Sequence, residues 1–230
     1  MFKDRFTTHS HIQRQVVSTS KSSSPVTCQR MTVQVSKGAT LYLLPDPVTC
    51  FKHASYNQLQ TFHLEDDASL IVLDSFTSGR KSLGEEWKFW RYYSVNDVWV
   101  NGRHVTKDVM LLEQENEGGV KNSRWDGVLP VRKLADRLAP YSCYATTILY
   151  GPAMLETLTN VSRCCENISV FKQASPPPLL WSFSWVGPHR EGGIIRVAAV
   201  DTEGVRDFLK ELLQGIKTLV GIDTYRKAFP

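Results

Sequence analysis

The first half of the chain alternates between apolar and polar residues with a period of two, and this pattern restricts it to β-structure. The stretches MTVQV, TLYLL, YNQLQTFHL and SLIVLDSF all carry it, and we expect strands to dominate residues 7–113. Turn sequences such as EDDA, SGRKS and NGR separate them at intervals that suit an antiparallel arrangement. Lys37 and Gly38 are expected to make the turn between the first two of these strands.

The stretch EEWKFWRYYS is expected to form a further strand that begins at Glu85. Alternation places aromatic side chains on both faces of this strand. They are Trp87, Phe89 and Tyr93 on one face and Trp90 and Tyr92 on the other. We therefore expect the strand to be covered on both sides.

The second half of the chain changes to a helical period. Residues 152–166 have Pro152 in a first helical turn and apolar residues at steps of three and four, which predicts a helix. A second helix is predicted over residues 203–219, with Thr202 as its cap. A shorter helical turn is expected after Pro130, and the SPPP segment is a rigid connector before the alternating stretch LLWSFSW.

Length and composition indicate a globular chain with a sizeable core. The chain has 230 residues, of which 42% are hydrophobic, and we expect a single domain over residues 1–230. The net charge of +4 comes from interspersed acids and bases, so a nucleic-acid partner is not expected. The sequence has no run of about 18 apolar residues and no signal-peptide core, so neither a membrane partner nor secretion is expected. Five cysteines without a CxxC pair favour reduced thiols and a cytoplasmic location, with a mitochondrial transit peptide as the alternative.

Common catalytic signatures are missing from the sequence. It has no GxSxG, GxxxxGK[ST], HExxH or helix-opening GxGxxG motif, so we do not expect an enzyme. His9 and His11 form an HxH pair, whose imidazoles would lie about 7 Å apart on one face of a strand. This pair has two interpretations, a metal site or a solvated strand. The adjacent Cys164 and Cys165 lack zinc-site spacing, and one of them is expected to point into the core.

The stretch LDSFTSGRKSLGEEWKF places an arginine between two carboxylates. Asp74 lies on a predicted strand, Arg80 in a glycine turn and Glu85 at the start of the next predicted strand. Two interpretations are open. Either Arg80 bridges a carboxylate at the turn, or Glu85 lines a water-filled passage that hands on a hard or borderline divalent cation.

The string LLPDPVTCF interrupts the alternation with Pro45 and Pro47 on either side of Asp46. Each proline fixes φ and lacks an N–H, so the two must end a sheet ladder or follow a sheet edge. We expect an extended bend that directs Asp46 away from its strand.

The order of these segments resembles that of the urease accessory protein UreD family, called UreH in some organisms. The matching segments are TTHSHI, Gln29 before MTVQVSKGATLYLLPDPVTCF, YNQLQTFHL, ASLIVLDSFTSGRKSLGEEWKF and RHVTKDVMLLE. They extend over residues 6–113, and the closing TLVGIDTYRKAF also looks like the end of the family's sequences. Two departures from the family pattern are noted: the chain is expected to lack the usual N-terminal strands with their glycine-rich segment, and His9 stands where a glutamine is usual.

The resemblance implies a mainly β fold of helically stacked strands with two packed α-helices. It also implies a scaffold and nickel conduit rather than a catalyst. Such proteins bind UreF, which recruits the GTPase UreG, and the assembly delivers nickel to the urease apoprotein. Nickel would be in transit, with no cofactor bound stably. The carboxylates at family motif positions form the candidate nickel path: Glu85, Asp74, Asp46 and Asp108.

The other residues of the family motifs are expected to have structural roles. They are Pro45, Pro47, Gly79, Arg80, Gly84 and Trp87. Two other functions are open. One is a metal-binding protein or enzyme that uses His9, His11 and Glu85, and the other is a plain β-rich interaction domain in which GRKSLGEEW is only a braced turn.

Overall fold

Two β-sheets form most of the molecule. The computed structural model describes residues 9–17, 26–114, 132–167 and 175–229, and for residues 9–17 it describes the backbone alone. The five-stranded sheet has the order β1 (His9–Val17), β2 (Val26–Val35), β5 (Ser55–Leu64), β7 (Arg91–Val100) and β8 (Arg103–Glu113). The six-stranded sheet has the order β10 (Leu179–Val186), β11 (Gly192–Ala199), β9 (Cys143–Tyr150), β6 (Ser69–Thr77) and β3 (Thr40–Leu43), and β4 (Val48–Thr49) also pairs with β6. The prediction of a mainly β fold with a few helices is confirmed.

The pairing of the strands is mixed, which differs from the expected antiparallel arrangement. Strands β2, β5 and β7 are parallel to one another, and β3 and β4 are parallel to β6. Lys37 and Gly38 do form a turn, with Gly38 at φ +68°, but β2 and β3 on either side of it belong to different sheets. The predicted turn between two strands is therefore confirmed, but the antiparallel pairing expected of those strands is wrong. The turn carries the chain from one sheet to the other.

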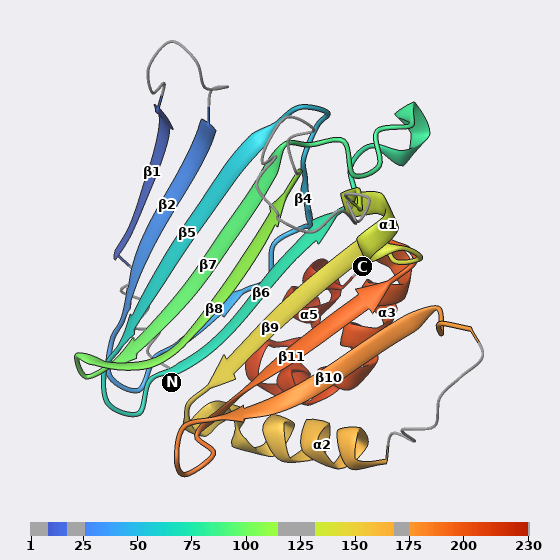
Figure 1. Cartoon of the computed structure of the whole chain (residues 1–230). Helices are drawn as coiled ribbons and strands as arrows, with labels where there is room; N and C mark the ends of the chain where they lie inside the picture. Colours follow the sequence, from blue (N-terminus) through green and yellow to red (C-terminus); the bar gives the residue numbers. More distant parts are fainter. Residues whose placement is uncertain (1–8, 18–25, 115–131, 168–174, 230) are drawn as a thin grey trace, which may run out of the picture.

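Helices cover the outer face of the six-stranded sheet. They include α2 (Leu155–Glu166), α3 (Thr202–Leu212), α4 (Lys217–Val220) and α5 (Ile222–Ala228), and Figure 1 shows α2, α3 and α5 beside this sheet. The helix predicted at 152–166 is present as the short 3-10 helix η2 (Pro152–Met154) followed by α2. The helix predicted over 203–219 is interrupted by the 3-10 helix η3 (Gln214–Ile216), and its cap is Asp201, whose Oδ1 accepts from the Gly204 N–H at 2.7 Å. The short turn after Pro130 is present as α1 (Leu134–Leu138).

Three apolar clusters fill the layers. One lies between the helices and the six-stranded sheet, and includes Ile71, Leu158, Ile195, Leu209 and Phe229. The other two lie between the sheets at opposite ends of the strands. The first of these includes Val33, Phe62, Leu70, Val72 and Ile194, and the second includes Phe76, Trp87, Phe89, Tyr92 and Leu112. The long strands thus bury apolar side chains at both of their ends.

The aromatic block is not a strand at its start. Residues 85–90 are irregular, and β7 begins only at Arg91. Trp87 has φ +55°, and its N–H donates to the Ser78 carbonyl at 2.6 Å, which folds this segment back onto the end of β6. Trp87 and Phe89 are buried, whereas Trp90 is exposed. The expectation that Glu85 begins a strand covered on both sides is therefore wrong.

Both cysteines of α2 lie outside the core. Cys164 is exposed and Cys165 is half-buried, so neither points into the core, because α2 buries Thr157, Leu158, Val161 and Ser162 instead.

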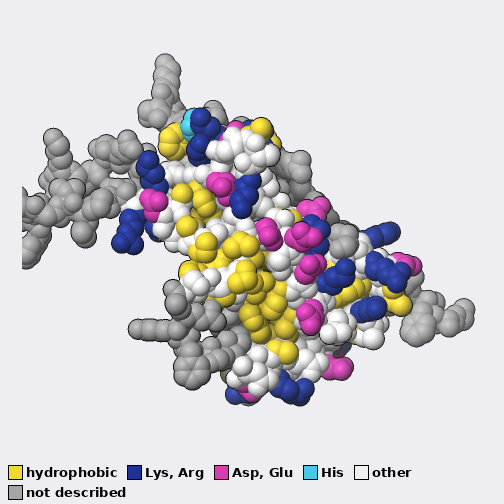
Figure 2. All heavy atoms as spheres, turned by 90° about the vertical axis from the view of Figure 1, so that its right-hand side faces the viewer, with side chains coloured by type: hydrophobic (Ala, Val, Ile, Leu, Met, Phe, Trp, Pro, Cys, Tyr) yellow, Lys and Arg dark blue, Asp and Glu magenta, His cyan; other side chains and the backbone are white. Residues whose placement is uncertain are grey.

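On the face drawn in Figure 2, acidic and basic side chains are interspersed beside a band of hydrophobic ones. No helix within the described ranges is both long and apolar enough to cross a membrane.

Candidate functional site, a buried polar layer between the sheets

Polar side chains separate the two apolar clusters that lie between the sheets. On the six-stranded sheet, Asp74, Thr146 and Arg196 occupy directly paired positions of β6, β9 and β11. On the five-stranded sheet, Gln60, Asn96 and Asp108 occupy paired positions of β5, β7 and β8, and Gln58 and Ser94 form the next pair. We call these eight residues the polar layer. Gln58, Gln60, Asp74, Ser94, Asn96, Asp108 and Thr146 are all buried.

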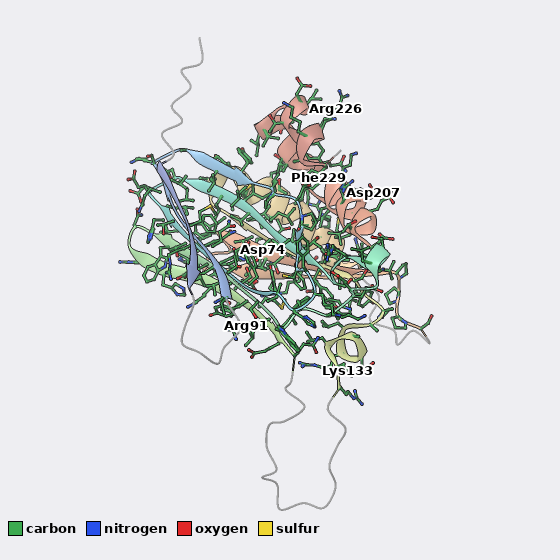
Figure 3. The ribbon with its side chains drawn as sticks, turned by 90° about the horizontal axis from the view of Figure 1, so that it is seen from above. Asp74, Arg91, Lys133, Asp207, Arg226 and Phe229 are labelled. Carbon is green, nitrogen blue, oxygen red and sulfur yellow. The ribbon has the colours of Figure 1, made fainter. Side chains whose placement is uncertain are left out.

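Asp74 is the centre of this layer, and Figure 3 shows it in the interior while the labelled Arg91, Lys133 and Arg226 lie at the periphery. Its carboxylate accepts hydrogen bonds from four neutral donors on β5 and β7. They are Ser94 Oγ at 2.5 Å, Asn96 Nδ2 at 2.8 Å, Gln58 Nε2 at 3.0 Å and Tyr92 OH at 3.3 Å. Burial, and then the charge of Asp74, raise the pKa of Tyr92 far above its ordinary value, so its phenol stays a donor. All four acceptor positions of the carboxylate are therefore filled.

One end of the layer continues toward a cavity. The Tyr56 hydroxyl lies 3.1 Å from Gln29 Oε1 and 3.2 Å from Gln58 Oε1, which extends the hydrogen bonds of Asp74 toward β2. Gln29 and Tyr56 line a cavity of about 410 Å³, together with Thr27, Thr49, Cys50 and Ser55. Burial raises the pKa of the Cys50 thiol to about 11, so this thiol is protonated at neutral pH.

The other end of the layer closes with an ion pair between the sheets. Arg196 Nη2 on β11 donates to Asp108 Oδ1 on β8 at 2.6 Å. The Asp108 side chain is only 9% exposed, whereas that of Arg196 is 46% exposed. Arg196 therefore reaches from solvent onto a buried carboxylate.

Two amide oxygens in the layer lack a hydrogen-bond partner among the described residues. They are Gln60 Oε1 and Asn96 Oδ1. Gln60 is 5% exposed and Asn96 is 1% exposed, so neither oxygen reaches bulk solvent. An unpartnered buried acceptor costs free energy, and such atoms in a folded protein point to a ligand or a bound water.

Glu85 lies outside the polar layer, in a braced turn. Arg80 donates two hydrogen bonds to the Glu85 carboxylate, from Nε to Oε2 at 2.8 Å and from Nη2 to Oε1 at 2.9 Å. The guanidinium of Arg80 lies 4.3 Å from the centre of the Phe51 ring. The hydrogen bond from Arg80 lowers the pKa of Glu85 below its ordinary value. The turn also contains the 3-10 helix η1 (Lys81–Leu83), which ends at Gly84 in the left-handed region. This geometry matches the interpretation of Arg80 as a bridge at the turn.

The Pro-Asp-Pro string forms an interruption at the edge of the six-stranded sheet. Before it, Leu43 of β3 pairs with Val72 of β6, and after it Val48 of β4 pairs with Phe76. The chain therefore stops pairing with β6 after Leu43 and pairs with β6 again at Val48. Asp46 is exposed at this interruption, as the sequence predicts.

The structure brings together two of the four predicted carboxylates. Asn96 is paired with Asp108 across β7 and β8, and its side chain donates to Asp74, so Asp74 and Asp108 belong to one layer. Asp46 and Glu85 do not belong to it. His9 and His11 lie on β1 opposite Gln34 and Thr32, and their side chains are outside the described part of the chain. Among the residues whose side chains are described, no group of three or more His, Cys, Asp or Glu is placed to hold a metal.

Two stacked mixed sheets with helices on one outer face define the class of this chain, a mainly β protein with few helices. Its family follows from the sequence as a whole. The model of the UreD urease accessory protein family matches residues 9–227, and the chain belongs to this family.

Similar proteins occur in fungi, plants and bacteria. The chain is 32% identical over 214 residues to urease accessory protein 4 of Cryptococcus neoformans and 29% identical over 216 residues to urease accessory protein D of Arabidopsis thaliana. It is 32% identical over 208 residues to urease accessory protein UreD of Sorangium cellulosum. These matches cover 87%, 86% and 88% of this chain, but 62%, 69% and 58% of the respective relatives. The chain thus spans about three fifths of the length of such relatives.

Proposed function

We propose that the chain is a urease maturation protein of the cytosol and not an enzyme. In this role it binds UreF, associates with UreG through UreF, and passes nickel to the urease apoprotein as cargo. The family match over residues 9–227 carries the proposal. The names of the three relatives, all urease accessory proteins, support it.

The polar layer is the proposed route of the nickel ion between the sheets. It holds two carboxylates, Asp74 and Asp108, against one guanidinium, that of Arg196, so its formal charge favours a cation. A transfer route needs weak sites that the ion can leave, and isolated oxygen ligands satisfy this better than a closed cage of nitrogen and sulfur ligands. The carboxylates and amides of the layer are ligands of this kind.

Complementation tests the proposed function. The chain is expressed in a urease-containing host that lacks its own UreD but retains UreF and UreG, and urease activity is measured. Restored activity is expected, together with recovery of UreF when the tagged chain is purified. An inactive host in which the chain is folded, and present at the level that UreD has in the unmodified parent strain, would contradict the proposal.

A plain β-rich interaction domain is the second candidate, because Glu85 is held in a bidentate contact with Arg80 rather than presented to a passage. In that case the chain would recover UreF but changes in the polar layer would affect only its stability. A metal-binding protein or enzyme using His9, His11 and Glu85 predicts tight stoichiometric metal binding by the isolated chain, which calorimetry measures.

A further inference from the structure

We propose that Gln60 Oε1, Asn96 Oδ1 and the carboxylate of Asp108 form a site for a divalent cation bound through oxygen ligands. The inference rests on the proposed function and deepens it, because it names where the cargo is held between the sheets. Water molecules would complete the coordination.

The two amide oxygens are the first observation. Both are buried and neither has a hydrogen-bond partner among the described residues. Amide oxygens accept hydrogen bonds or coordinate cations, and they cannot donate. Their most favourable ligand is therefore a cation or a water molecule, and an anion is excluded.

The register of the strands is the second observation. Gln60 on β5 is paired with Asn96 on β7, and Asn96 is paired with Asp108 on β8, so the three side chains follow one another in a row. All three are buried on the face toward the six-stranded sheet, where Asn96 contacts Asp74 and Asp108 contacts Arg196. Neighbouring strands lie about 5 Å apart, so Asn96 is beside each of the other two residues, while Gln60 and Asp108 are two strands apart on either side of it and an ion shared by all three must lie next to Asn96.

Charge is the third observation. Arg196 contacts Oδ1 of Asp108 and offsets one of the two carboxylates of the layer. Asp74 has its acceptor positions filled by four neutral donors, so it supplies negative charge beside the site rather than a ligand. A cation at the row of three oxygens would compensate this charge.

The chemistry of the ligands defines the class of cation. Carboxylate and amide oxygens suit Mg²⁺, Mn²⁺ and Ca²⁺, and they bind Ni²⁺ less tightly than nitrogen or sulfur ligands do. Weak binding is what a transfer route requires. Mn²⁺ is the suitable probe, because it favours oxygen ligands and its electron paramagnetic resonance signal reports the free ion.

The test compares Mn²⁺ binding by the purified full chain and its variants. Gln60→Met removes one ligand at nearly constant volume and is expected to weaken binding about tenfold. Gln60→Glu adds a negative ligand and is expected to strengthen it by a similar factor. Thr147→Val is the matched control, since Thr147 Oγ1 is another buried oxygen for which the described residues supply no hydrogen-bond partner, on the opposite face of the six-stranded sheet. It should leave Mn²⁺ binding unchanged.

Stability distinguishes this site from a structural role of Gln60. Removing an unpartnered buried acceptor does not lower the urea midpoint, so both Gln60→Met and Thr147→Val should unfold at or above the wild-type midpoint. The inference is overturned if the wild-type chain shows no saturable Mn²⁺ binding, or if both Gln60 variants bind as the wild type does. A chain that restores urease activity but binds no Mn²⁺ would leave the proposed function standing and refute the site.

Discussion

Arg196 on β11 donates to Asp108 on β8 at 2.6 Å, and this contact joins the two sheets where the polar layer ends. Arg196→Met would leave a carboxylate whose side chain is 9% exposed without its cation. We expect a loss of about 2 kcal/mol in the free energy of unfolding, between the values for surface and fully buried pairs. Urea denaturation measures it.

The control for this variant is an ion pair on the surface. Lys81 Nζ lies 3.5 Å from Glu86 Oε1, and the two side chains are 54% and 45% exposed. Glu86→Gln should lower the free energy of unfolding by less than about 0.5 kcal/mol. Equal losses in Arg196→Met and Glu86→Gln would contradict a special role of the contact between the sheets.

Asp74 accepts four hydrogen bonds in the interior, so Asp74→Ala would leave four donors of β5 and β7 without their acceptor. We expect the free energy of unfolding to fall by about 3 kcal/mol. Asp46→Ala is the matched control at an exposed position and should change it by less than about 0.5 kcal/mol. If the two variants have the same urea midpoint, the hydrogen bonds of Asp74 do not stabilise the fold.

Several strands of this fold could be predicted from alternation alone, but their pairing could not. Turn residues such as Lys37 and Gly38 predict where the chain reverses, and they carry no information on which sheet the next strand enters. Pairing of β2 with β5 and of β5 with β7 is parallel and depends on contacts between residues far apart in the chain. The left-handed backbone conformation of Trp87 could not be predicted from the sequence either, because the propensity of aromatic residues favours strands.

The sequence carries a signal for the polar layer in the strand that follows the Pro-Asp-Pro string. In YNQLQTFHL, a period of two places Gln58 and Gln60 on the same face as Phe62 and Leu64. Amides on an apolar face indicate a buried polar contact. Asp74, the partner of Gln58, could be predicted as a candidate, but Arg196 could not, because only the stacking of the sheets brings it to Asp108.

Gly79 is expected to tolerate no side chain. It has φ +119°, and a Cβ atom there would lie 2.5 Å from the Glu85 carbonyl oxygen. Gly79→Ala should therefore lower the free energy of unfolding by about 3 kcal/mol. Gly84 has φ +64° with open space around it, so Gly84→Ala should cost only about 1 kcal/mol, the strain of the left-handed region. Thermal unfolding compares the two, and an equal cost would show that the close contact relaxes easily.

Glu85 gives a pH-dependent prediction. Its folded-state pKa lies below the ordinary value of 4.5 because of the hydrogen bond from Arg80. A carboxyl of this kind adds stability that is complete above its unfolded pKa and is lost as the pH falls through its folded pKa. The difference in unfolding temperature between the wild type and Glu85→Gln should therefore be largest near neutral pH and decrease as the pH falls below about 4. A difference that is constant from pH 7 to pH 3 would contradict the pairing.

The same variant separates the two interpretations of Glu85. A braced turn predicts that Glu85→Gln activates urease in the complementation host as the wild type does, once the amounts of folded chain are matched. A conducting carboxylate predicts a large loss of activation while UreF is still recovered with the chain. Because Arg80 occupies both oxygens of Glu85, we expect the first result, and the second would place Glu85 on the nickel route after release from Arg80.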